Sequence, residues 1–151
     1  NIPVITYAEF AFMRAELAAS SAVTTNDDAE TFYNEAVRSS IEWYDLIARE
    51  AKLLNYTPVT TDEVDAYLAE PGIAFDPALA LDQIASQAYI HFFKQPAEGW
   101  AWWKLTGYPN TTSNVLTWTN MQSNGGSMDI PRRAPLPFRD LPVRTGHTAV
   151  T

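Results

Sequence analysis

The sequence predicts an all-α fold, and three observations carry that prediction. Apolar residues recur at three- and four-residue steps through most of the first 106 residues, which is the period of an amphipathic helix. Capping and helix-breaking residues separate these stretches. The segment after Pro109 lacks the period and is polar and rich in Asn. We therefore expect a helical part at residues 6–106 and a loop-rich part at residues 107–151.

The first helix is expected from about Thr6 to Ser20, with two apolar faces. One face is small and lets a neighbouring helix approach closely; it consists of Ala8, Ala11, Ala15, Ala18 and Ala19. The other face is large and consists of Phe10, Met13 and Leu17. Two apolar faces predict helical neighbours on both sides.

The second helix, about Asp28 to Leu54, has the clearest helical period in the chain. A polar connection leads to it and ends in an N-cap signal at Asn26 or Asp27. The residues of its stripe are Ala29, Tyr33, Ala36, Ser40, Trp43, Ile47, Ala51 and Leu54. Helices joined by a short loop pack antiparallel. The small-aromatic-small order at the start of the series is typical of the second helix of a tetratricopeptide unit, so we predict tetratricopeptide-like helix pairs.

A third helix is expected at Thr60–Glu70, and the stretch Asp76–Pro109 then organises the remainder of the chain. Asp76 and Pro77 are read as the N-cap and first residue of a helix of four to five turns. Its apolar positions are Leu81, Ile84, Ala85, Ala88 and Phe92, widened by Tyr89 and Phe93. Pro96 opens a shorter helix, and Gly107 and Pro109 end it. On that helix Trp100 and Trp103 share a face while Trp102 points away, so the three rings cannot fill one pocket.

The loop-rich segment offers few elements. Val115–Thr119 is read as one short strand and Gly125–Gly126 as a turn. Ile130–Pro137 has three prolines and must be extended. The remainder, from Arg139, is read as a surface tail.

The composition excludes several classes of function. The net charge is −8, which argues against nucleic acid or an anionic lipid surface as a partner. No stretch is long and apolar enough to span a membrane. The chain contains no cysteine, so neither thiol chemistry nor a disulfide framework is expected.

Residues suited to catalysis are few, and we expect no enzymatic activity, no cofactor and no metal site. His91 lies among apolar residues and is read as a hydrogen-bonded or partly exposed core histidine; His147 has no ligand spacing to any other residue. The HExxH, GxSxG, P-loop and GxGxxG motifs are absent. A carboxylate pair for glycoside hydrolysis is left open, because any two of the 18 acids could meet.

Aromatic residues beside a polar segment suggest a sugar-binding surface instead. Flat rings suit the apolar C–H face of a sugar, and amides and hydroxyls suit its polar edge. Trp118 lies in an uncharged loop outside every expected helix and is the first candidate for a sugar platform, with Asn120 and Asn124 as edge donors. Trp102 completes the candidate set. The alternative is that Trp118 folds back as a plug over the helix that carries Trp100 and Trp103.

Three stretches in order resemble the carboxy-terminal part of the SusD/RagB family of outer-membrane glycan-binding lipoproteins. The first is the pair ITYAEFAFMRAELAAS and AETFYNEAVRSSIEWY, with Asn34 and Arg38 four residues apart. The second is LDQIASQAYIHFF followed by EGWAWWKLTGYP, and the third is Ile130-Pro131-Arg132-Arg133. The chain departs from the family pattern at Leu136-Pro137, where the family has Tyr-Pro, and at Asp140, where a Glu is common.

The resemblance implies an all-α, tetratricopeptide-like scaffold with an irregular ligand-binding side, and residues 1–151 would be the carboxy-terminal part of one such domain. It implies a surface-exposed lipoprotein of the outer membrane, held by a lipid anchor absent from this chain. Such a protein binds an oligosaccharide or other nutrient and delivers it to a TonB-dependent, SusC-like transporter. The alternative function is a tetratricopeptide-like scaffold for protein–protein interaction without a small-molecule ligand. A glycosidase is a distant third.

Overall fold

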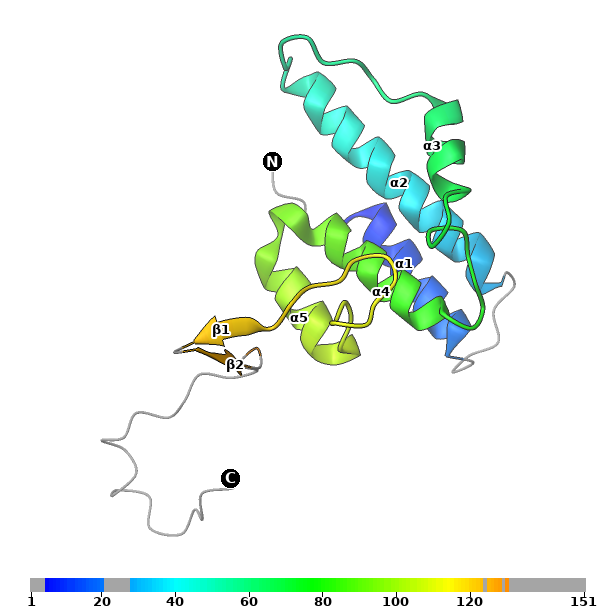
Figure 1. Ribbon diagram of the computed structural model, residues 1–151. Helices are drawn as coiled ribbons and strands as arrows, with labels where there is room; N and C mark the ends of the chain where they lie inside the picture. Colours follow the sequence, from blue (N-terminus) through cyan, green and yellow to red (C-terminus); the bar gives the residue numbers. More distant parts are fainter. Residues whose placement is uncertain (1–4, 21–27, 124, 129, 131–151) are drawn as a thin grey trace. The chain divides into compact units, whose positions relative to one another are not determined.

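The structure is a computed structural model that describes residues 5–20, 28–123, 125–128 and 130. Residues 1–119 form one compact unit and residues 120–151 a second. The described helices all lie in the first unit (Figure 1): α1 (Tyr7–Ala19), α2 (Ala29–Glu50), α3 (Thr61–Leu68), α4 (Ala80–His91), the short 3-10 helix η1 (Phe92–Lys94) and α5 (Pro96–Thr106). The second unit contains the strands β1 (Met121–Ser123) and β2 (Gly126–Met128). The predicted all-α fold is confirmed.

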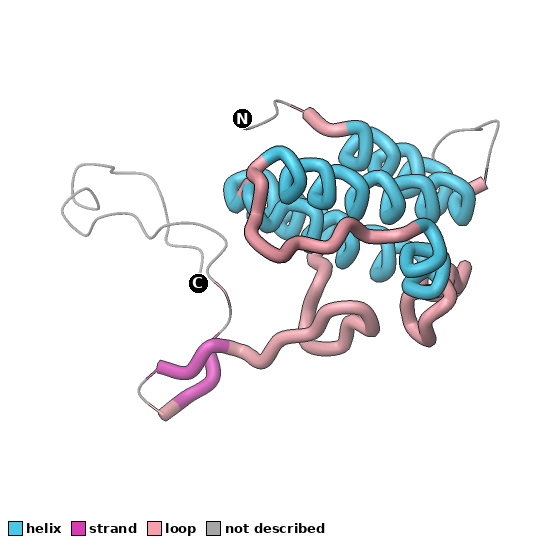
Figure 2. Tube along the Cα trace, turned by 90° about the horizontal axis from the view of Figure 1, so that it is seen from above, coloured by secondary structure: helices cyan, strands magenta, loops and turns pink. Residues whose placement is uncertain are grey.

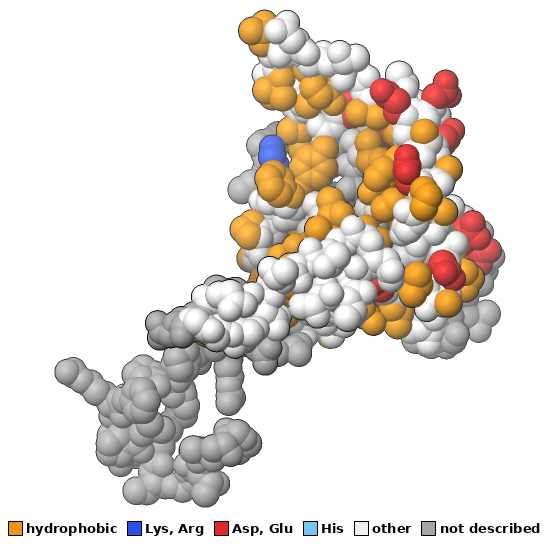
Figure 3. All heavy atoms as spheres, viewed as in Figure 1, with side chains coloured by type: hydrophobic (Ala, Val, Ile, Leu, Met, Phe, Trp, Pro, Cys, Tyr) orange, Lys and Arg blue, Asp and Glu red, His pale blue; other side chains and the backbone are white. Residues whose placement is uncertain are grey.

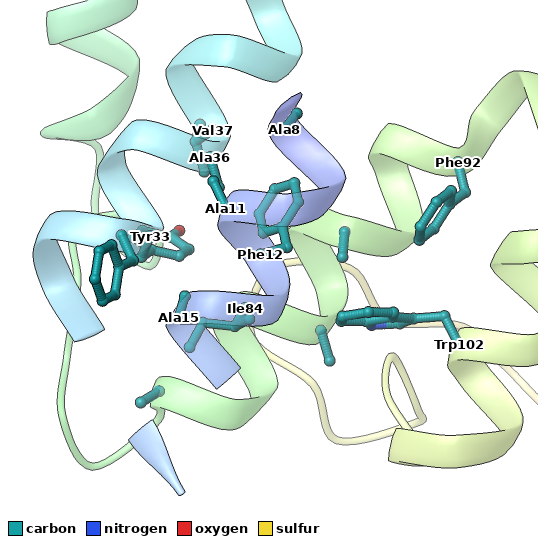
Figure 4. Close-up of a cluster of buried hydrophobic side chains, with 14 residues drawn as sticks. Ala8, Ala11, Phe12, Ala15, Tyr33, Ala36, Val37, Ile84, Phe92 and Trp102 are labelled. Atoms are coloured by element: carbon teal, nitrogen blue, oxygen red, sulfur yellow. The ribbon is translucent and has the colours of Figure 1, made fainter. Parts of the chain in front are cut away.

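Helices α1 and α2 pack against each other in antiparallel order. The Tyr7 hydroxyl donates a hydrogen bond to Glu35. Two turns further along α1, the Arg14 guanidinium lies 3.9 Å from the centroid of the Phe32 ring. The small side chains on one face of α1 let α2 approach closely. Ala11 on this face has no exposed surface. Figure 4 shows this face against residues of α2.

The large apolar face of α1 is partly exposed. Phe10, Met13 and Leu17 are 49%, 37% and 45% exposed. Helix α1 still has two helical neighbours, because α4 packs on it beside α2, as the contact between the Phe12 and His91 rings shows.

Helix α2 is shorter than its pattern predicts, since it ends at Glu50 and not at Leu54. Asp28 is its N-cap and accepts a hydrogen bond from the amide of Thr31 at 2.8 Å, so the cap lies just beyond the predicted positions. At the other end, the buried Asp45 carboxylate accepts from the Val59 amide at 3.0 Å and from the Tyr56 hydroxyl at 2.8 Å. These bonds fold the chain back and lower the pKa of Asp45.

Helix α4 also begins later than the sequence predicts. Asp76 is not its N-cap, because its carboxylate accepts from the amide of Ala78 at 2.9 Å and its carbonyl accepts from Leu79 at 2.9 Å. These bonds form a separate turn. The helix starts at Ala80, and its N-cap residue makes no side-chain hydrogen bond.

Buried polar side chains of α4 connect it to most of the first unit. Gln83 donates to the carbonyls of residues 72 and 74 at 3.0 and 2.9 Å, and Gln87 donates to the Tyr67 hydroxyl at 2.8 Å. Asp82 accepts from the backbone and side-chain amides of Asn114 at 2.9 and 3.2 Å. These bonds fix the segments before and after the helix. Figure 2 shows the loops of the chain in pink beside the cyan helices.

His91 completes this set at the carboxyl end of α4. Its Nε2 lies 2.7 Å from the Thr6 hydroxyl and its Nδ1 lies 2.8 Å from the Ser40 hydroxyl, so one ring joins α4 to α1 and α2. The ring is 2% exposed, and burial lowers the pKa of His91 to about 4. The expectation of a hydrogen-bonded core histidine is confirmed.

The segment after α5 contains no strand at Val115–Thr119, and that prediction is wrong. The bonds between Asp82 and Asn114 fix this segment as a loop against α4. The described strands lie later, and β1 and β2 pair antiparallel around the predicted turn at Gly125, which has a φ of 80°. Arg132, Arg133 and the departures at residues 136–140 lie outside the described residues.

We predict that enlarging the small contact between α1 and α2 destabilises the chain. Ala36 has no exposed surface, so Ala36→Leu is expected to lower the free energy of unfolding by about 1–3 kcal/mol through overpacking. Urea denaturation measures this. The exposed Ala101→Leu is the control and should have little effect; equal stability of both variants would contradict the close-packed pair.

We also predict that His91 makes stability depend on pH. The unfolded ring takes up a proton near pH 6.5 and the folded ring only near pH 4. Because the unfolded state binds more protons in this window, stability falls as the pH is lowered from 6.5 to 4, by up to roughly 3 kcal/mol. Urea denaturation across this range should show the fall.

The matched variant is His91→Gln, which lacks the titrating ring. It should be less stable at pH 7, because it cannot reproduce both hydrogen bonds, but its stability should vary less between pH 6.5 and 4. Equal slopes for the two proteins would show that another group is responsible.

Candidate functional site

Helix α5 divides its tryptophans between two environments. Trp100 and Trp103 are three residues apart and share a face; their rings stack with centroids 5.1 Å apart and planes at 27°. Trp102 points to the core, is 8% exposed and packs on Phe92 with centroids 5.9 Å apart (Figure 4). Its indole N–H has no hydrogen-bond partner among the described residues. The prediction that the three rings cannot share one pocket is confirmed.

Trp118 extends this stack from the following loop. Its ring centroid lies 5.9 Å from that of Trp103 and 6.0 Å from that of Tyr89 on α4. The ring is half-buried. We call the four rings of Tyr89, Trp100, Trp103 and Trp118 the aromatic cluster. The contact between Trp118 and Trp103 agrees with the alternative prediction, in which Trp118 folds back over the helix that carries Trp100 and Trp103.

The loop that carries Trp118 is fixed from two sides. The Trp103 indole N–H donates to the carbonyl of Pro109 at 3.1 Å. The Asp82 carboxylate accepts the amide of Asn114. The two anchored residues, Pro109 and Asn114, lie nine and four residues before Trp118, and they explain why an uncharged loop can place a tryptophan against a helix.

The four predicted site residues are not brought together by any described contact. Trp118 belongs to the aromatic cluster, whereas Trp102 lies in the core. Asn120 falls in the second unit, and Asn124 lies outside the described residues.

An apolar hollow of about 370 Å³ lies beside the aromatic cluster. The end of α4 and η1 contribute Tyr89, Ile90, Phe92 and Phe93. The first turns of α5 contribute Pro96, Gly99 and Trp100, and the loop contributes Leu116. We call this space the α5 hollow. None of its lining residues is charged.

Sequence reasoning missed this hollow because it assigned Phe93 to the buried face of a longer helix. In the structure α4 ends at His91, and the 3-10 turn that follows leaves Phe93 81% exposed. Pro96 restricts only Gln95, the residue before it, so the sequence carried no signal that α4 ends as early as His91.

The electrostatics do not favour acid–base chemistry around the hollow. His91 is the nearest titratable ring to η1 in sequence, but it is buried with both nitrogens hydrogen-bonded. Burial raises the pKa of Glu9, a carboxylate that also accepts from the backbone amide of Thr6 in the capping box of α1. Among the described residues, no group of three or more His, Asp or Glu converges as a metal set.

The surface has two further features. Figure 3 shows acidic side chains gathered on the side of α3 and apolar side chains spread over the helices of the same face. In the described part of the chain, no helix combines the length and hydropathy required to cross a membrane.

Comparison with known proteins gives a match to a family and to a solved structure. A SusD-like family model, described as "Starch-binding associating with outer membrane", matches residues 1–137. A solved structure described as "Bacteroidetes AC2a SusD-like" is 32% identical, with a TM-score of 0.68 over 92% of this chain. The match covers 25% of that structure, so this chain spans about a quarter of its length.

No curated protein matches the chain. The family match covers most of the sequence, and the structural match has the same helical fold. The chain therefore belongs to the SusD-like family, which is described as starch-binding and associated with the outer membrane.

Proposed function

We propose that this chain is part of a non-enzymatic protein that binds a glycan or another nutrient at the bacterial outer membrane. In this proposal the protein is a surface-exposed lipoprotein and delivers its ligand to a TonB-dependent, SusC-like transporter. The observation that carries the proposal is the family match over residues 1–137, whose description names starch binding and the outer membrane. The aromatic cluster supports it, since stacked rings at a surface suit the C–H faces of sugars.

Trp118 remains our proposed ligand contact, now as a member of the aromatic cluster. Its ring is half-buried, so part of it is available to a ligand. Its contacts with Tyr89 and Trp103 hold it in one orientation, which lowers the entropy lost on binding. Asn120, Asn124 and Trp102 stay in the proposal as residues to be tested by substitution.

A scaffold for protein–protein interaction is the second candidate, and one observation favours it. Tyr7, Phe10, Met13 and Leu17 recur along α1 at steps of three and four residues and are 37–55% exposed. An exposed apolar stripe of this kind is typical of an interaction surface.

We predict that the chain binds neutral oligosaccharides and that Trp118→Ala weakens the binding at least tenfold. Isothermal titration calorimetry with malto- and cello-oligosaccharides measures the affinity. The same substitution removes two aromatic contacts and should lower the free energy of unfolding by about 1–3 kcal/mol.

Trp118→Phe separates the two effects, because it keeps a ring between Tyr89 and Trp103. It should recover most of the stability and only part of the affinity. If Trp118→Ala loses stability but keeps full affinity, Trp118 is a plug and not a ligand contact.

A further inference from the structure

We propose that the α5 hollow is the seat of one neutral sugar ring, which stacks on Trp100. This inference rests on the proposed function, and it assigns the ligand to residues that the sequence did not single out. It makes Trp100 the platform for this sugar ring; Trp103 stacks on the Trp100 ring, and Trp118 in turn contacts Trp103.

The platform is pre-organised. Trp103 covers one face of the Trp100 ring at a centroid distance of 5.1 Å, yet Trp100 remains 41% exposed and lines the hollow. Trp103 is in turn fixed by its hydrogen bond to Pro109 and by the ring of Trp118. A ring held in this way loses little conformational freedom when a ligand stacks on it.

The shape of the hollow depends on Gly99. A Cβ atom at this position would lie 3.3 Å from the Cβ of Phe92, a tight contact. The absence of a side chain lets α5 approach η1 closely. The resulting volume of about 370 Å³ falls at the small end of the range for small-molecule sites, as a single sugar unit requires.

The chemistry of the lining selects a neutral ligand with apolar faces. The lining holds no charged side chain, so an anion or cation entering it would lose hydration without gaining a counter-charge. The Tyr89 hydroxyl can exchange hydrogen bonds with a polar edge. Aromatic faces with a hydroxyl among the lining side chains match a pyranose ring.

The test is fluorine NMR on the whole 151-residue chain labelled with 5-fluorotryptophan. Single Trp→Phe variants assign the five tryptophan resonances. The probes are maltoheptaose, cellohexaose and, as an apolar competitor, decanol. We expect at least one oligosaccharide to shift the Trp100 resonance the most, while Trp102, which lies in the core, shifts least.

Affinity measurements on variants complete the test. Trp100→Ala should weaken oligosaccharide binding at least tenfold, and Trp100→Phe by a few-fold, since a smaller ring remains. Leu105→Ala is the matched control: Leu105 is also on α5, is 77% exposed and does not line the hollow, so its loss should leave the affinity unchanged.

The outcomes separate this inference from the proposed function. Binding that shifts Trp118 but not Trp100, and that survives Trp100→Ala, overturns the inference and leaves the proposed function intact. A Trp100 shift with decanol alone identifies an apolar site and overturns the inference. The absence of any oligosaccharide binding overturns both for this chain.

Discussion

The fold of the first unit depends on hydrogen bonds inside an apolar environment, and His91 is the clearest case. One neutral ring bridges the hydroxyls of Thr6 and Ser40 and so joins three helices at one point. A buried polar group without partners would cost free energy, but a fully bonded one specifies a single arrangement. Gln83, Gln87 and Asp82 do the same for α3 and for the loops on either side of α4. The alanine face of α1 lets α2 approach closely, and these hydrogen bonds fix the relative positions of the elements.

The aromatic side of the unit is a consequence of that arrangement. Asp82 holds the loop after α5 at Asn114, and the loop then carries Trp118 to Tyr89 and Trp103. The 3-10 turn after His91 leaves Phe93 exposed and opens the α5 hollow. Helix α4 therefore contributes both to the core and to the proposed ligand surface. A change in its buried polar residues is expected to affect both.

Two surfaces of the first unit suit different kinds of partner. The α5 hollow is concave, uncharged and small, as suits a neutral ligand. The apolar stripe on α1 runs along a helix instead of surrounding a cavity, a form that suits contact with another protein surface. The two surfaces occupy different helices, so substitutions can alter one without the other.

The sequence alone determined the class of fold and the helices, because these depend on local periodicity and on short-range hydrogen bonds. Thr60, Pro96 and Gly107 act where their chemistry predicts, whereas the predicted N-caps of α2 and α4 are displaced. The family resemblance was also visible from motifs in order. The structure decided what depends on distant partners. Asp45 binds the chain at Val59, beyond the end of α2, and Asp82 binds the loop at Asn114, next to residues 115–119; both bonds join residues too far apart in sequence for local propensity to predict. The same holds for Trp102 and Trp100, whose core and surface positions depend on which face of α5 meets the rest of the unit.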